Sequence, residues 1–118
     1  MSHIFHACLR TAWEAAKAEG YYRGSADDER DGFIHFSDST QIAESTKTHH
    51  GGQEGLVLLV VAIARLDEAA GALRWESSRG GRLFPHLYAP LPTRAVTGVH
   101  DLPLDEDGCH RFPPLPED

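Results

Sequence analysis

The stretch GLVLLVVAIARL, residues 55–66, is apolar at odd and even positions alike. Successive side chains of a strand point to opposite faces, so this pattern predicts a strand that is covered on both sides. Shorter strand candidates surround it: HIFHACL at 3–9, GFIHF at 32–36, FPHLYAPL at 84–91 and AVTGVHDL at 95–102. We therefore expect residues 55–66 to form the central strand of a small sheet.

Two short helices are predicted between these strands. Residues 11–14, TAWE, show the capping-box pattern, and the helix that they predict runs from about residue 12 to Glu19, with Gly20 at its end. Asp38 and Gln41 repeat the pattern before a second helix, which is predicted to end near residue 49. Residues 21–30 are polar and predict an exposed loop, while residues 66–76 fit either a turn of helix or a strand. Together these elements predict an α+β fold.

Composition limits the classes of function. The chain has 118 residues, 41% of them apolar and 25% charged, which suits one soluble domain over residues 1–118. Its net charge of −7 argues against bulk binding of nucleic acid. Cys8 and Cys109 are too few for a disulfide framework or a four-thiolate metal site. The N-terminus lacks a signal-peptide pattern and residues 56–64 are too short to span a bilayer, so we expect a cytoplasmic protein with no membrane association.

Three of the eight histidines stand inside apolar, strand-like runs: His6 in IFHAC, His35 in FIHFS and His86 in FPHLY. A buried neutral imidazole needs partners for both nitrogens, and an unpaired one costs about 1–3 kcal/mol. Each ring therefore either makes structural hydrogen bonds or faces a cavity. We expect these three, with Tyr22, Glu76 and Tyr88, to line a shared polar cleft. By contrast, His49 and His50 sit at a predicted helix end, where helix capping explains them.

Three chemistries suit such a cleft. Metal binding would use imidazole and carboxylate, but the sequence contains no local H-x-x-x-H or C-x-x-C pair, so no metal site is predicted. Nucleophilic catalysis by Ser37 lacks the G-x-S-x-G turn, and Ser37 or Asp38 is better explained as a helix cap. The third is recognition of a sugar or nicotinamide by histidine and tyrosine, which the neighbouring aromatic residues favour.

The order of IFHAC, DGFIHFS, GLVLLVVAI, RWE and FPHLYAPL resembles the bacterial family called domain of unknown function 952. The resemblance extends from His3 to about Pro114. That family is grouped with the ADP-ribosyltransferase-like folds, and the layout resembles the catalytic domain of poly(ADP-ribose) polymerases. The resemblance implies an ADP-ribosyltransferase-like α+β fold with small, split, antiparallel-rich sheets and short flanking helices. It also implies NAD as a substrate, with no tightly bound cofactor.

The resemblance also implies roles for particular residues. His6 matches the first-strand histidine that contacts the NAD ribose, although Ala7 and Cys8 follow it in place of Gly-Thr. His35 matches the segment that lines the nicotinamide pocket. The catalytic glutamate of the polymerases belongs on a later strand, where this chain has His86, whereas Glu76 comes earlier.

We therefore expect a domain that binds NAD or an ADP-ribose-like nucleotide in a histidine-lined cleft, with transferase or glycohydrolase chemistry. The expected nucleotide-binding residues are His6, Tyr22, His35, Ser37 and Tyr88, and the expected catalytic residues are Glu76 and His86. One alternative is a noncatalytic ligand-binding or interaction module of the same fold. A second is a small metal-dependent hydrolase. No protein partner can be named from the sequence.

Overall fold

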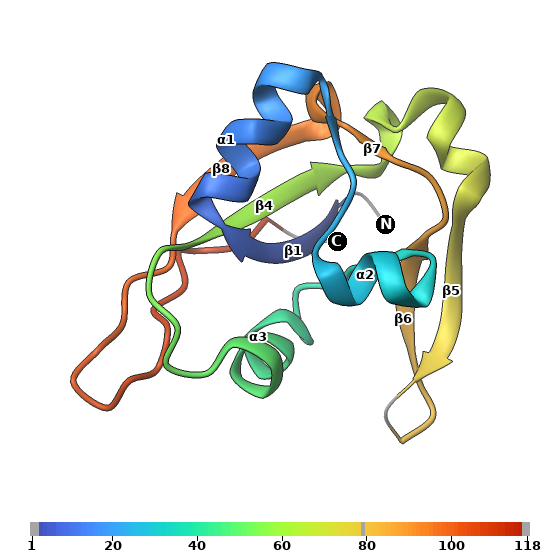
Figure 1. The fold of residues 1–118 in the computed structure, drawn as a ribbon. Helices are drawn as coiled ribbons and strands as arrows, with labels where there is room; N and C mark the ends of the chain where they lie inside the picture. The colour runs from blue at the N-terminus through green and yellow to red at the C-terminus, as the bar shows by residue number, and fades with distance from the viewer. Residues whose placement is uncertain (1–2, 79, 117–118) are drawn as a thin grey trace.

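The computed structural model describes residues 3–78 and 80–116. The helices are α1 (Arg10–Glu19), α2 (Ala26–Asp31) and α3 (Ile42–His50), and short 3-10 turns cover Ile63–Arg65, Asp67–Ala72 and Thr93–Ala95. The strands are β1 (His3–Leu9), β2 (Tyr21–Tyr22), β3 (Ile34–His35), β4 (Leu56–Ala62), β5 (Leu73–Ser78), β6 (Arg82–Leu87), β7 (Leu91–Pro92) and β8 (Val96–Asp101). They form three antiparallel groups, β1-β4-β8, β3-β6-β5 and β2-β7 (Figure 1). The α+β class with small split sheets is thus confirmed.

Strand β4 is central, as its apolar pattern predicted. Its odd-numbered residues Val57, Leu59 and Val61 belong to one core cluster, which also contains Trp13 of α1. Leu56, Leu58 and Val60 belong to a second cluster, together with Ile42 of α3. Figure 1 shows α1 and α3 on opposite sides of this sheet. The two helices therefore cover the two faces of β4.

The predicted capping box at the start of α1 is wrong. Strand β1 passes directly into α1 at Arg10, and the N-cap residue, Leu9, makes no side-chain hydrogen bond to the helix. Thr11 lies inside the first turn of α1, two residues after the N-cap position, so its side chain cannot cap the helix. The Arg10 amide instead donates to the Gly55 carbonyl (2.8 Å). The predicted end is confirmed, because Gly20 adopts a positive φ of 94°.

The loop predicted over residues 21–30 is wrong. Strand β2 pairs with β7, and Ser25 begins α2 with a capping box in which its side chain accepts from the Asp28 amide (3.3 Å). The Asp28 carboxylate accepts in return from the Ser25 amide (2.7 Å). Tyr22 and Asp28 are buried. The polar composition of residues 21–30 suggested an exposed loop. Its acidic residues instead lie on the capped helix α2, and one of them, Asp28, points into the protein.

The start of α3 agrees better with its predicted cap. The Gln41 amide donates to the Asp38 carboxylate, and the Asp38 amide donates to the Gln41 side chain, both at 3.0 Å. The ambiguous segment 66–76 contains both of its alternatives, a 3-10 turn followed by β5.

The two larger sheets meet at the end of β3. This strand covers only part of the predicted residues 32–36, and just beyond it Ser37 exchanges two backbone hydrogen bonds with Phe5 of β1 (2.8 and 2.9 Å). That bridge places β3 of one sheet beside β1 of the other. Helix α2 lies between the first sheet and the β5–β6 hairpin (Figure 1). Within the described residues, no helix is long and apolar enough to cross a membrane.

Candidate functional site

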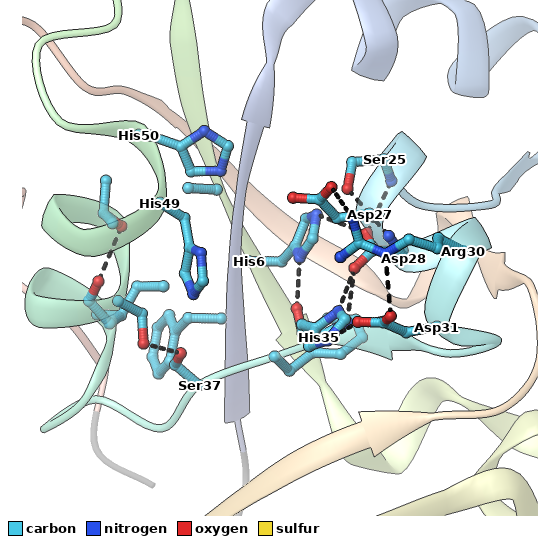
Figure 2. Close-up of a pocket in the computed structure, with 16 residues that line it drawn as sticks. His6, Ser25, Asp27, Asp28, Arg30, Asp31, His35, Ser37, His49 and His50 are labelled. Carbon is cyan, nitrogen blue, oxygen red and sulfur yellow. Dashed lines mark hydrogen bonds and ion pairs between the residues drawn. The ribbon is translucent and has the colours of Figure 1, made fainter. Parts of the chain in front are cut away.

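A cavity of about 120 Å³ opens where β1, β3, α2 and α3 converge (Figure 2). His6 enters it from β1, His35 from β3, and Asp28 and Asp31 from α2. The far wall comes from α3, including Ser45, Thr46, His49 and His50. The bridge between Phe5 and Ser37 brings these elements together, since it fixes β1 against the segment that carries His35.

His6 is a buried imidazole with both nitrogens engaged. Its Nδ1 donates to the His35 carbonyl oxygen (2.6 Å), which can only accept. The ring hydrogen is therefore on Nδ1, and Nε2 accepts from the Tyr22 hydroxyl (2.8 Å). Burial lowers the pKa of His6 and raises the pKa of Tyr22, so the imidazole stays neutral and the phenol keeps its proton.

Asp28 places a negative charge at the side of the cavity. Its Oδ1 accepts from the His35 amide (3.1 Å) and from His35 Nδ1 (2.5 Å), while Oδ2 accepts from the Ser25 amide (2.7 Å). Burial alone would raise the pKa of Asp28. The hydrogen bond from the His35 ring, the nearby His6 ring and the backbone amides outweigh burial and hold the pKa at about 2. The carboxylate is therefore ionised at neutral pH.

His35 is bound between two carboxylates. Its Nδ1 faces Asp28, and its Nε2 lies 3.1 Å from Asp31 Oδ2. The hydrogen bond to Asp28 leads the effects that raise the pKa of His35, against the opposing effect of burial. Both nitrogens can donate only from the protonated ring, so this geometry favours the imidazolium. Arg30 binds Asp27 and Asp31 at the exposed rim (Figure 2).

The wall opposite these charges is lined by hydroxyl groups and imidazoles. The Ser37 hydroxyl donates to Ser45 Oγ (2.9 Å), and its backbone holds the sheet bridge, while the Asp38 side chain accepts hydrogen bonds in the turn that leads into α3. His49 and His50 end α3, as predicted, and they also line the cavity. Their position on the helix could be predicted from sequence, whereas their contact with the cavity depends on how α3 packs against β1.

Glu76, His86 and Tyr88 form a second cluster outside the cavity. Glu76 Oε1 accepts from His86 Nδ1 (2.8 Å) and from the Tyr88 hydroxyl (2.6 Å). The hydrogen bond from Tyr88, followed by that from His86, lowers the pKa of Glu76. Phe33 stacks on the His86 ring at 4.2 Å between centroids.

The expected shared cleft is thus divided in two. His6, His35 and Ser37 line the cavity, and Tyr22 supports His6 from behind. The other three predicted residues lie in the second cluster, which meets the cavity at the His35 ring, 5.5 Å from that of His86.

The sequence analysis missed four residues of this region: Asp28, Arg30, Asp31 and Phe33. The first three belong to the segment predicted as a loop. Its S-x-x-D pattern could have revealed the cap of α2, because Asp can take the place of Glu at the third helical position, as it does here. Phe33 alternates with His35, and this two-residue spacing could have placed both rings on one face of the strand.

Across residues 3–78 and 80–116, no group of three or more His, Cys, Asp or Glu side chains is arranged to hold a metal ion. Both cysteines are free thiols, and burial raises the pKa of Cys8 to about 11.

Solved structures show close relatives of this fold. The chain is 45% identical to protein CC0527 from Caulobacter crescentus, whose crystal structure superposes with a TM-score of 0.84 over 92% of this chain and 93% of that one. A crystal structure of a CC0527 double mutant gives 46% identity and a TM-score of 0.85 with the same coverage. Its solution NMR structure gives 48% identity and a TM-score of 0.77, covering 91% of this chain and 90% of that one.

No match was found among curated proteins. A family model described as "Protein of unknown function (DUF952)" matches residues 7–99, which is most of the chain. The chain therefore belongs to the DUF952 family.

Proposed function

We propose that the cavity between β1, β3 and α3 binds the nicotinamide end of NAD or of an ADP-ribose-like nucleotide. The observation that supports this best is the ionised Asp28 beside His6 and His35 in a small cavity. The resemblance to ADP-ribosyltransferase-like folds, drawn from IFHAC and DGFIHFS, favours the same ligand.

Size and charge both suit a cationic ring. A cavity of about 120 Å³ is smaller than the several hundred Å³ typical of sites that enclose whole drug-sized ligands, so it would hold one ring while the rest of the nucleotide stays outside. The nicotinamide of NAD⁺ is a pyridinium, and a buried carboxylate attracts such a charge more strongly than water-exposed ones do. The neutral imidazole of His6 offers a ring surface beside it, and the positive charge of the His35 imidazolium is balanced by Asp28 and Asp31.

A noncatalytic binding module is the second candidate, and the position of Glu76 favours it. Glu76 is the glutamate that the resemblance suggested for catalysis, yet it lies in the outer cluster with His86 and Tyr88. Among the carboxylates that line the cavity, Asp28 is buried and already accepts three hydrogen bonds, which hold it in place and leave little of its accepting capacity for a ribose hydroxyl. Binding can therefore be tested separately from chemistry.

The test is a titration of NAD⁺, NADH, ADP-ribose and nicotinamide into the wild-type protein, followed by thermal unfolding and calorimetry. A ligand at ten times its dissociation constant should stabilise the fold by about 1.4 kcal/mol. We expect NAD⁺ to bind about tenfold more tightly than NADH, because the two have the same outline and differ in the ring charge.

Asp28→Asn should abolish this preference, whereas His100→Gln, an exposed change on β8, should preserve it. A lack of stabilisation by all four ligands would rule out the nucleotide proposal. Equal affinity for NAD⁺ and NADH would leave nucleotide binding in place and reject the role given to Asp28.

A further inference from the structure

The outer cluster contains an imidazole whose two nitrogens are in very different surroundings. His86 Nδ1 lies 2.8 Å from Glu76 Oε1, and a carboxylate oxygen can only accept, so the ring hydrogen is on Nδ1. The Tyr88 hydroxyl donates to the same oxygen at 2.6 Å and helps to fix the carboxylate. In the neutral ring, Nε2 then carries a lone pair.

No described residue supplies a partner for that lone pair, although His86 is only 5% exposed. Every fully buried side-chain nitrogen or oxygen of the described residues has a hydrogen-bond partner, so Nε2 must retain contact with solvent. His6 shows what a structural histidine looks like in the same molecule: both of its nitrogens are bonded inside the protein. His86 does not follow that pattern.

The ring of His86 is also held in position. Phe33 stacks on it at 4.2 Å with an interplanar angle of 27°, and His35 meets it nearly edge-on at 5.5 Å and 67°. The titratable and charged groups around it are Glu76 and Arg74 of β5, Tyr88 and the His35 ring. A fixed imidazole with a carboxylate on one nitrogen and a free second nitrogen is the arrangement of a general base.

We infer that Glu76 and His86 form an acid–base pair that activates an oxygen nucleophile for attack on the nucleotide bound in the neighbouring cavity. This inference rests on the proposed function, because the His35 ring that lines the cavity also contacts His86. The nucleophile is water or an alcohol, and His86 Nε2 removes its proton.

The reaction balances without a further reagent. The oxygen forms a bond to the anomeric carbon of the ribose while the bond from that carbon to the pyridinium nitrogen breaks. The nitrogen keeps the electron pair and leaves as neutral nicotinamide. The proton passes from the nucleophile to His86 Nε2, where Glu76 stabilises the imidazolium, and then to solvent. Glu76 acts through His86 and is a positioning residue.

The experiment measures NAD⁺ binding and nicotinamide release separately, by calorimetry and by chromatography of the products. We expect His86→Gln to reduce turnover at least about 100-fold, within the range found for general bases, and to leave the dissociation constant within about twofold. The matched control is His100→Gln, the same substitution at an exposed histidine of β8, which should retain wild-type turnover. Thermal unfolding of each variant checks that it is folded.

Glu76→Gln gives a readout that a merely structural role would not move. Nitrogen-15 spectra should show the His86 hydrogen on Nδ1 in the wild type and a mixture of tautomers in Glu76→Gln.

Three results would overturn the inference. If NAD⁺ binds but releases no nicotinamide, or if His86→Gln turns over as fast as the wild type, the base is rejected while nucleotide binding stands. If NAD⁺ does not bind at all, both proposals fail.

Discussion

Three histidines with similar sequence surroundings end in three different chemical states. His6 is neutral with both nitrogens bonded, His35 is held between two carboxylates, and His86 has one bonded nitrogen. The sequence predicted that each ring would need partners, because burial demands them. It could not predict which residues these partners are, because they come from other elements of the fold. The partner of the His35 ring, for example, is Asp28 on α2.

The Asp28–His35 pair leads to a prediction about pH and stability. The pKa of Asp28 falls from 3.8 to about 2 on folding, so its contribution is complete above pH 3.8 and is lost as the pH falls toward 2. The pKa of His35 is raised above 6.5, so its contribution is complete below pH 6.5 and is lost as the pH rises through the folded value. Both describe one interaction, which should stabilise the fold most between these limits.

The measurement is urea unfolding of the wild type and Asp28→Asn at about pH 2, 5 and 9. At about pH 5 the variant should be less stable by about 2 kcal/mol, from the interval between the two pKa values of Asp28. The difference should shrink at both other pH values. Asp27→Asn is the control, because Asp27 is exposed and pairs with Arg30 at the rim, and it should change stability by less than about 0.5 kcal/mol. A difference that does not vary with pH would contradict the assignment.

At the scale of elements, periodicity predicted more than local signals did. The two-phase apolar pattern of residues 55–66 identified β4 as a central strand, because burial on both faces needs apolar residues in both phases. The capping patterns were less reliable. T-x-x-E at 11–14 caps nothing, since β1 already leads into α1 at Arg10, whereas the overlooked S-x-x-D at 25–28 caps α2.

The effects of the two capping patterns on stability can be compared by substituting Ser25 and Thr11 with alanine. Ser25→Ala removes the side chain that accepts from the Asp28 amide, and it should cost about 1 kcal/mol of unfolding free energy. The loss of this cap should also accelerate amide exchange over residues 26–31, the helix from which Asp28 orients His35. Thr11→Ala should change stability by less than about 0.5 kcal/mol, since Thr11 is exposed and is not a cap. Chemical denaturation measures both values, and a larger loss for Thr11→Ala would contradict this account of α1.

At the scale of the whole molecule, the candidate site depends on how the two three-stranded sheets join. The sequence predicted the strands but not their partners, because the bridge from Phe5 to Ser37 and the pairing of β3 with β6 connect residues far apart in the chain. For the same reason it placed Glu76 and His86 in one cleft with His6. Local patterns reveal which face of a strand is buried, whereas the division of polar residues between two clusters follows from sheet pairing.

One core cluster receives residues from both sheets, and this predicts how the chain unfolds. The cluster contains Leu59 of β4, Trp13 of α1 packs within it, and Trp75 of β5 packs against it. Unfolding one sheet would expose apolar surface of the other, so both should unfold together, as the prediction of one domain requires. Trp13→Phe and Trp75→Phe each leave one tryptophan as a fluorescent reporter.

Within each of these single-tryptophan proteins, fluorescence and far-ultraviolet circular dichroism should give the same denaturation midpoint. Leu59→Ala, added to either protein, should lower stability by about 2–5 kcal/mol and move both signals equally, because the new void lies in the shared core. Leu83→Ala, at a side chain that is mostly exposed, is the matched control and should have little effect. Separate midpoints would show that the sheets are independent units. The cavity between β1 and β3 would then lie at a mobile junction, where it could not hold His6, Asp28 and His35 at fixed distances from a bound ring.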